Sequence, residues 1–150
     1  FEFSLMVMAG SALAVADEFD TADSDILDVY QNKELLELND EGFVGNPYSL
    51  DFTLPSSSCW FGNTENGDVV LGLFNREEKE ISYSIDFQKV LGFERSEVEN
   101  IRDLWSHKNL GSFKNTFDVT LKPHTCRIVR ISPVKGAQSS FGLLCGCTKQ

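Results

Sequence analysis

The sequence has few basic residues: 13 Lys and Arg stand against 23 Asp and Glu, which gives a net charge of −10. Contact with nucleic-acid phosphates requires a basic surface, so this balance argues against a nucleic-acid partner. Long hydrophobic runs are also missing. The apolar stretch at residues 5–16 is too short to cross a bilayer, and we expect no membrane partner.

Cysteines are few and their spacing excludes a zinc site. Cys145 and Cys147 are one residue apart and have no partner ligands nearby. Cys59 and Cys126 fall in predicted strands, where a free cysteine acts as a small buried hydrophobic residue. A disulfide cannot be inferred from the sequence alone. We therefore predict no metal, and we expect no cofactor.

The apolar stretch at residues 5–16 invites interpretation as a signal peptide, because it ends in Ala-Val-Ala before Asp17. Glu2 is the only charge before it, whereas signal peptides carry Lys or Arg there. Gly10 and Ser11 interrupt the run. We therefore favour a structural role for this stretch.

Residues 1–41 have an α/β pattern. A helix from Phe3 to Ala9 is closed by Gly10, and the apolar run from Ala12 to Ala16 reads as a strand buried on both faces. Asp23 and Ser24 then precede a helix with Ile26, Leu27 and Tyr30 on one face, and Asn32 caps a second helix with Leu35, Leu36 and Leu38. This order of helix, buried strand, acidic loop and helix is typical of one repeat of a (β/α)8 barrel.

Residues 42–133 have an all-β pattern. Gly42, Gly45, Asn46 and Pro47 mark the boundary, and Asn66-Gly67 predicts a tight turn between strands at Cys59–Phe61 and Val69–Phe74. The second of these is apolar on both faces and should be a central strand. Two further segments, at residues 81–87 and 117–122, alternate apolar and polar residues. The fold class expected is mainly β, an antiparallel β-sandwich after the barrel repeat.

Residues 134–150 follow without clear periodicity, and we interpret them as a tail that is partly disordered.

Four segments together resemble the C-terminal part of the α-galactosidase-like glycoside hydrolases, family 27 and its clan. They are FSLMVMAGSALAVADEFDT (3–21), VYQNKELLELND (29–40), CWFGNTENGDVVLGLFNRE (59–77), and the closing pair RDLWSHKNLGSF (102–113) with PHTCRIVRIS (123–132). Their order and spacing match the family over residues 3–133. The first resembles the end of the catalytic barrel, and the others resemble the helix and the strands that follow it.

The resemblance implies a retaining glycosidase with two Asp residues as nucleophile and acid/base. In the family these residues lie on the fourth and sixth barrel strands, which have no counterpart in this chain, so no catalytic residue is assigned. Asp17 would lie at the end of the eighth strand, where it could line the sugar pocket or cap the next helix. The partners expected are an α-galactoside or related glycan and the remainder of the barrel. The family is compatible with a secreted or lysosome-like compartment, which the sequence alone leaves open.

Other candidate residues have stronger structural interpretations. Trp105 is expected to pack in the sandwich, and His107 and His124 lack a nucleophile motif. Core packing is also expected of Trp60 and Phe61, in preference to a sugar-stacking platform with Trp105. The acidic group lacks the spacing of a calcium loop, so it is expected to be solvated; it comprises Asp17, Glu18, Asp20, Asp23 and Asp25.

Two alternatives to a hydrolase fragment stay open at this point. The chain could be an independent carbohydrate-binding sandwich, or a secreted structural sandwich whose mature form begins at Asp17.

Overall fold

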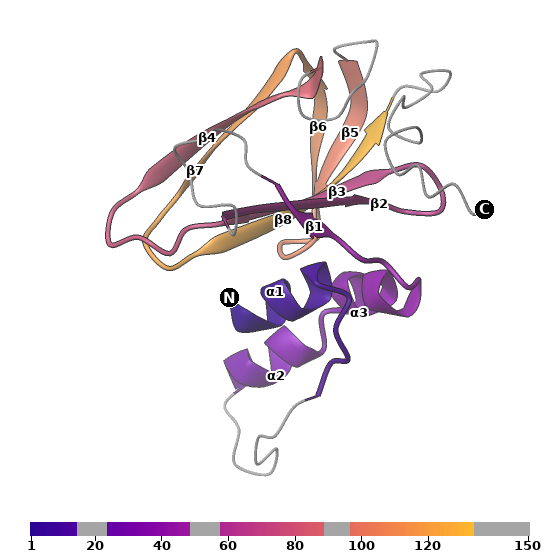
Figure 1. The fold of residues 1–150 in the computed structure, drawn as a ribbon, viewed down its shortest axis with the longest axis vertical. Coiled ribbons are helices and arrows are strands. Elements are labelled where there is room, and N and C mark those ends of the chain that lie inside the picture. The colour runs from indigo at the N-terminus through magenta and orange to yellow at the C-terminus, as the bar shows by residue number, and fades with distance from the viewer. Residues whose placement is uncertain (15–23, 49–57, 89–96, 134–150) are drawn as a thin grey trace, which may run out of the picture.

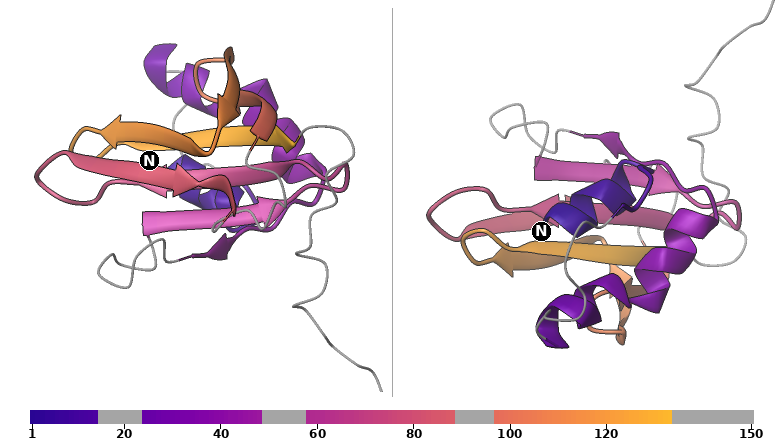
Figure 2. Two further views of the ribbon diagram at one scale, coloured as in Figure 1. Left: turned by 90° about the horizontal axis from the view of Figure 1, so that it is seen from above. Right: turned by 90° about the horizontal axis from the view of Figure 1, so that it is seen from below.

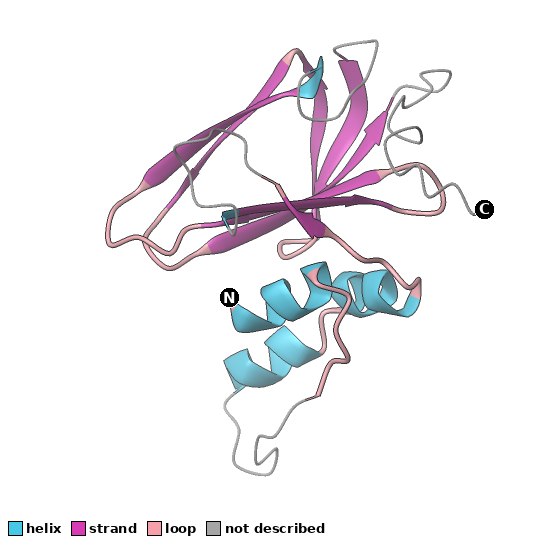
Figure 3. Cartoon of the chain, viewed as in Figure 1, coloured by secondary structure: helices cyan, strands magenta, loops and turns pink. Residues whose placement is uncertain are grey.

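The computed structural model describes residues 1–14, 24–48, 58–88 and 97–133. These residues form three layers, a group of helices, a six-stranded sheet and a two-stranded sheet (Figure 1). The three helices within residues 2–40 lie on one side of the larger sheet, and the smaller sheet lies on the other (Figure 3). The predicted antiparallel sandwich is confirmed, and its larger sheet is covered on both faces.

The larger sheet is antiparallel throughout, with the order β1-β2-β3-β8-β5-β6. Its strands are β1 (Asn46–Pro47), β2 (Cys59–Asn63), β3 (Val69–Phe74), β5 (Glu97–Asp103), β6 (Lys108–Lys114) and β8 (Cys126–Pro133). β8 is the last of these in the chain, yet it lies in the centre of the sheet between β3 and β5.

The smaller sheet consists of β4 (Ile81–Asp86) and β7 (Thr116–Leu121), paired from Ile81↔Leu121 to Asp86↔Thr116. The alternation predicted for both segments is confirmed: the apolar side chains at 83, 85, 117, 119 and 121 are buried, and Ser82 and Ser84 are exposed. Successive side chains of a strand point to opposite faces, so each strand turns one apolar row toward the larger sheet.

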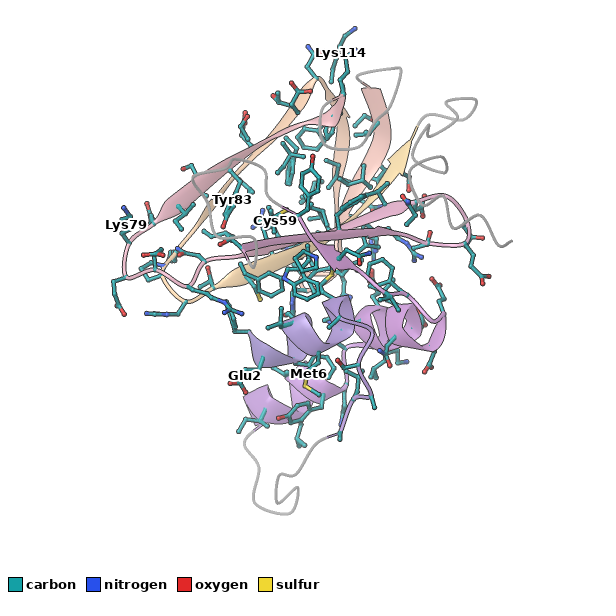
Figure 4. All side chains as sticks on the ribbon, in the orientation of Figure 1. Glu2, Met6, Cys59, Lys79, Tyr83 and Lys114 are labelled. Carbon is teal, nitrogen blue, oxygen red and sulfur yellow. The ribbon has the colours of Figure 1, made fainter. Side chains whose placement is uncertain are left out.

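The main core fills the space between the two sheets. Figure 4 shows Cys59 and Tyr83 in this space, while Lys79 and Lys114 project from its ends. The phenol of Tyr83 donates a hydrogen bond of 2.8 Å to the carbonyl of Phe74, which joins the small sheet to the large one. The buried residues of this core are Cys59, Val69, Leu71, Leu73, Tyr83, Ile85, Phe87, Val98, Ile101, Phe117, Val119, Leu121, Val129 and Ile131.

Strand β3 is buried along its whole length, as the sequence predicts for a central strand. Leu71 and Leu73 face the main core, whereas Val70 and Phe74 face the helices. The Asn66-Gly67 turn is also confirmed. Gly67 has a φ of +84°, which suits glycine, and its N–H donates to the carbonyl of Thr64 at 3.0 Å.

Asn75, immediately after β3, is buried and ties the two sheets together. Its side-chain amide lies within donating distance of the carbonyls of Lys79 (2.8 Å), Leu121 (3.0 Å) and Lys122 (2.9 Å). Its Oδ1 accepts from the N–H of Glu77 at 2.9 Å. One side chain, with two N–H donors and one acceptor, therefore contacts four backbone groups around the ends of β3, β4 and β7.

The helices are short, and the caps predicted at Gly10 and Asn32 are confirmed. α1 (Glu2–Met8) ends at Gly10, which has a φ of +62°. The N–H groups of Gly10 and Ser11 donate to the carbonyls of Val7 and Met6, both at 3.0 Å, in a Schellman motif. α2 is Ser24–Tyr30, and α3 is Lys33–Asp40, where Asn32 accepts from the N–H of Leu35. Figure 2 shows the helices against the face of the larger sheet.

One expectation is not met in the described residues: residues 12–14, the described part of the strand predicted from Ala12 to Ala16, form no strand. No strand pairs with it among the described residues, and the Ala14 N–H instead bonds locally to the carbonyl of Ala12 at 3.1 Å. The helix predicted after it is confirmed as α2, and its early residue Ile26 is 41% exposed. Helix α2 contacts the core through Val29 and Tyr30, near its end, so its early residues are not covered.

The predicted tail, residues 134–150, lies outside the described residues, as does Asp23 of the predicted cap. None of the helices that the structure describes is long and apolar enough to cross a membrane.

Candidate functional site

Asp17, the one sequence-predicted substrate-binding residue, lies outside the described residues. The same holds for Glu18, Asp20 and Asp23, and the side chain of Asp25 is not described. In the parts of the chain that the structure describes, no group of three or more His, Cys, Asp or Glu side chains could hold a metal ion. The role of Asp17 stays a prediction.

The aromatic residues weighed as a sugar-stacking platform do not form one. Trp60 and Phe61 are adjacent on β2, so they point to opposite faces of the sheet. Trp60 packs with the helices, and Phe61 packs on the main core, where its ring meets Tyr48 edge-on at 5.4 Å. Trp105, which was expected to pack in the sandwich, follows β5 and packs between the sheet and α1, where its ring lies 6.4 Å from that of Phe3.

Neither histidine has a catalytic arrangement. His107 is half-exposed, and its Nδ1 lies 2.7 Å from Oε1 of Glu34. His124 is exposed, and its Nε2 lies 3.2 Å from Oε1 of the exposed Glu78. Each histidine therefore faces a carboxylate, and no hydroxyl or thiol nucleophile accompanies either pair among the described contacts. The structural interpretation of both histidines is supported.

Side chains from distant parts of the sequence instead meet at the contact between the helices and the larger sheet. We call this the helix–sheet interface. Its buried residues are Phe3, Val7, Met8, Leu35, Leu38 and Phe43 from the helical side and Val70, Phe74, Leu104 and Ile128 from the sheet side. Fully burying one such side chain contributes roughly 1.5–3 kcal/mol, so this is a second core.

Two glycines let the helical region approach the sheet closely. A Cβ on Gly72 of β3 would lie 2.9 Å from Cγ of Met8, closer than real side chains allow. A Cβ on Gly62 of β2 would lie 2.8 Å from the ring of Phe43. The helix and the loop after α3 therefore rest directly on sheet backbone, which only glycine permits at these positions.

Polar groups fasten the same contact. Ser4 of α1 is fully buried, and its Oγ accepts from Trp105 Nε1 at 2.9 Å and lies 3.2 Å from Cys126 Sγ. The side chain of Asn32 donates to the carbonyl of Leu104 at 3.0 Å. Buried polar groups cost free energy unless they are paired, so these bonds hold α1 and α3 at defined positions on the sheet.

Charged groups add a third set of ties, along α3. Arg102 of β5 holds Glu34 with two hydrogen bonds, from Nε to Oε2 at 2.7 Å and from Nη2 to Oε1 at 2.5 Å. Arg130 of β8, the cross-strand neighbour of Arg102, binds Glu41 at the other end of α3 at 2.8 Å. Two like charges that would repel each other across the sheet are thus each matched by a carboxylate of one helix.

The pKa of Glu34 is lowered from its usual 4.5, chiefly by the hydrogen bonds from Arg102, against an opposing effect of burial, with His107 adding to the lowering. Ionised Glu34 is therefore the form that this site favours. The Glu34 side chain borders a shallow open hollow. The residues that line it are Gln31, Lys33, Glu34, Glu37 and His107.

The arrangement can hold two layers together, but it does not supply an acid/base pair or a nucleophile within the described residues. Sequence reasoning missed its central members, Ser4, Glu34 and Arg102. A single polar residue in a helix or strand has no periodic signal of its own. For Arg102, the only available signal was its place in the RDLW segment of the family resemblance.

The described residues thus form a β-sandwich with a layer of helices packed on one face of its larger sheet. A family model described as the alpha galactosidase C-terminal beta sandwich domain matches residues 55–131. The chain belongs to this family, as the resemblance in the sequence indicates.

Relatives of known name agree with this assignment. The isomalto-dextranase of Arthrobacter globiformis is 39% identical over 140 residues, covering 88% of this chain and 21% of the relative. Alpha-galactosidase 2 of Arabidopsis thaliana is 23% identical, covering 87% of this chain and 32% of the relative. This chain therefore spans about a fifth to a third of the relatives that it matches.

Solved structures show the same fold. The A. globiformis isomalto-dextranase, in a complex with panose, matches with a TM-score of 0.75 and 37% identity over 89% of this chain and 23% of that one. Alpha-galactosidase I of Mortierella vinacea matches with a TM-score of 0.75 and 18% identity over 87% of this chain and 34% of that one. This chain thus corresponds to the C-terminal domain of glycoside hydrolases of the α-galactosidase type.

Proposed function

We propose that this chain is the C-terminal part of a retaining glycoside hydrolase that acts on terminal α-linked galactose. The observation that carries the proposal is the family match over residues 55–131, together with a helical layer fastened to that sandwich. In this proposal, residues 1–41 are the end of a (β/α)8 barrel, residues 42–133 are the supporting sandwich and residues 134–150 are a tail.

The chemistry follows from the class of enzyme. A retaining glycosidase uses two carboxyl groups about 5 Å apart, one as nucleophile and one as acid/base, through a covalent glycosyl-enzyme intermediate. We place both as Asp residues upstream of Phe1. The sandwich contributes stability and position, since its described side chains lack such a pair.

The helix–sheet interface gives the sandwich its task in this proposal. If α1 and α3 are the last helices of the barrel, then Ser4, Asn32 and Glu34 tie the barrel to the sandwich. Asp17 would follow the eighth barrel strand on the face where barrel enzymes bind substrate. Asp17→Asn in the complete enzyme should then alter the kinetics, and unchanged kinetics would exclude Asp17 from the site.

A second candidate substrate is supported by one specific observation. The isomalto-dextranase is 39% identical to this chain, whereas the plant α-galactosidases are 23–24% identical. This difference favours a dextran-like α-glucan as the alternative to an α-galactoside. The sandwich itself does not contain the residues that would decide between the two sugars.

The decisive experiment starts from the gene. The coding sequence upstream of Phe1 is determined, and the complete product is assayed with an aryl α-galactoside and with dextran. About 250 additional in-frame residues with Asp at the fourth and sixth strand ends, and galactose release, are expected. Release of isomaltose from dextran alone would replace the first substrate with the second.

The pure chain 1–150 serves as the control, and it should hydrolyse neither substrate. Hydrolysis of an α-galactoside by this chain would contradict the placement of the catalytic pair upstream. A start codon close before Phe1 would contradict the hydrolase proposal itself and leave a binding or structural role.

A further inference from the structure

Glu34 is one of the points at which the helical layer and the sandwich meet through charge; Glu41, which Arg130 binds, is another. The two oxygens of Glu34 accept from two side chains of the sandwich: Arg102 binds both oxygens, and His107 binds Oε1. Glu34 stands in the first turn of α3, one residue after Lys33, and its side chain is 21% exposed. Water can therefore deliver a proton to this carboxyl without unfolding of the protein.

The backbone of the turn after β5 is shaped to bring the second partner into place. His107 has a φ of +56°, a left-handed conformation that non-glycine residues adopt rarely. Asp103 organises the same turn, because its Oδ1 accepts from the N–H groups of Trp105 and Ser106 at 3.0 and 2.9 Å. The turn thus brings His107 to the same carboxylate that Arg102 binds.

The paired bonds from Arg102 are strongest with an ionised carboxylate. A carboxylate accepts at both oxygens, whereas a protonated carboxyl carries a hydrogen on one oxygen and loses its charge. The bidentate Arg102 contact would then lose one arm and its charge assistance, which is the larger part of its strength. The favourable position of a negative charge in the first turn of α3 would also be lost.

We propose that Glu34 is an acid-sensitive latch between the helical layer and the sandwich: a proton on this carboxyl makes α3 open from the sheet more often, while the sandwich stays folded. This inference concerns the described chain itself and does not depend on the proposed hydrolase activity. The apolar contacts of the helix–sheet interface remain in the opened latch, so protonation changes the frequency of opening and does not detach the layer.

Charged groups around Glu34 set the pH range. On α3 these are Lys33 and Glu37, and from the sandwich they are Arg102 and His107. The pKa of Glu34 is lowered in the folded protein, so its stabilising effect is complete above 4.5. That effect is lost as the pH falls through the lower, folded pKa.

Hydrogen exchange followed by mass spectrometry tests the latch on the whole chain. Glu34→Gln is the uncharged mimic of the protonated state. At pH 7 we expect exchange in α3 to be faster in this variant than in the unchanged protein by a factor on the order of ten. This factor corresponds to the loss of one charge-assisted hydrogen-bonded contact, reduced because the contact is partly exposed to water. Exchange in β4 and β7 should not change. As the pH falls through the lowered pKa of Glu34, the α3 rates of the two proteins should converge, because the unchanged protein then loses the charge as well.

Glu37→Gln is the matched control. It lies three residues further along α3, beside the same hollow, and its side chain makes no hydrogen bond or ion pair with the sandwich within the described ranges. Equal α3 exchange in the Glu34 and Glu37 variants at pH 7 would overturn the proposal. So would acceleration in β4 and β7 as large as in α3, because Glu34 would then act on global stability alone.

A second variant keeps the test decisive if Glu34→Gln does not fold. His107→Asn preserves a residue type that tolerates the left-handed conformation but removes the imidazole. It should accelerate α3 exchange by a smaller factor, since Arg102 keeps its two bonds. No change in α3 at pH 7 would exclude His107 from the latch.

Discussion

The two faces of the six-stranded sheet are covered in different ways. The face toward β4 and β7 is covered by a row of apolar side chains that alternate along each strand, with Asn75 and Tyr83 as ties at one end. The face toward the helices combines apolar side chains with glycines that allow close approach and with buried or charged ties. Packing on the first face depends on the alternation of apolar residues along the strands, whereas packing on the second depends on individual glycine, polar and charged residues.

This difference teaches where the fold tolerates change. A patterned apolar core accepts substitutions that conserve volume, with losses usually below about 1.5 kcal/mol. A contact that relies on glycine or on a buried hydrogen bond has no such latitude, because any added atom or lost partner is felt. The helix–sheet interface should therefore be the less tolerant of the two faces.

The largest expected effect comes from shortening a buried side chain on the face of β3 that contacts the helices. Phe74 is fully buried against the helices, so Phe74→Ala should reduce the free energy of unfolding by about 3–5 kcal/mol. Denaturant unfolding measures the loss. Leu71→Ala, on the opposite face, is the matched control at about 2–5 kcal/mol. Hydrogen exchange separates them: Phe74→Ala should accelerate α1 and α3 above all. Identical exchange patterns in both variants would contradict the distinction between the faces.

Removing the Asn75 side chain should have the next largest effect. Asn75→Ala leaves the carbonyls of Leu121 and Lys122 and the N–H of Glu77 without this partner. With about 1–3 kcal/mol for a buried unpaired group, a loss on the order of 3 kcal/mol is expected by thermal or denaturant unfolding. Asn100→Ala, which removes an exposed side-chain hydrogen bond, is the control and should change stability little. A loss below about 1 kcal/mol for Asn75→Ala would mean that water replaces its bonds.

Adding a methyl group at Gly72 should have a smaller effect that depends on Met8. Gly72→Ala should cost about 1–3 kcal/mol, because the new Cβ collides with Cγ of Met8. The double variant with Met8→Ala should be more stable than the sum of the single losses predicts, since the methyl group enters the space that Met8 leaves. Additive losses in this double-mutant cycle would show that the clash is relieved elsewhere.

The smallest expected effect concerns the alkylation of Cys59, which should be very slow in the folded protein. Burial raises the pKa of the Cys59 thiol to about 12. The reactive thiolate is therefore scarce at pH 8, and an alkylating reagent should modify Cys59 only after unfolding. Peptide mapping of the native chain checks this, with Cys126, which is partly exposed, as the internal reference. Rapid native modification of Cys59 would show that the main core opens often.

Much of the sandwich could be predicted because its signals are periodic. The alternation at residues 81–87 and 117–121, the Asn66-Gly67 turn and the apolar run of β3 each follow from local sequence. The caps at Gly10 and Asn32 are local as well. These features need no knowledge of distant residues, and the structure confirms them.

The helix–sheet interface could not be predicted in the same way, because its contacts join residues far apart in the chain. Ser4 meets Trp105 across 101 positions, and Glu34 meets Arg102 across 68. The strand expected at Ala12–Ala16 failed for a related reason. An apolar run becomes a strand only if another strand pairs with it, and the sequence of the run does not show whether one does.

The position of β8 has a consequence for how the protein is made. β8 lies between β3 and β5, so residues 126–133 join two parts of the sheet that are synthesised earlier. During translation, β1-β2-β3 and β5-β6 can form as separate antiparallel groups, but the edges that β8 later covers stay open until it emerges. Such long-range pairing slows folding and leaves strand edges free to pair with other chains. The interval before β8 leaves the ribosome is thus the stage at which a nascent chain most needs a chaperone.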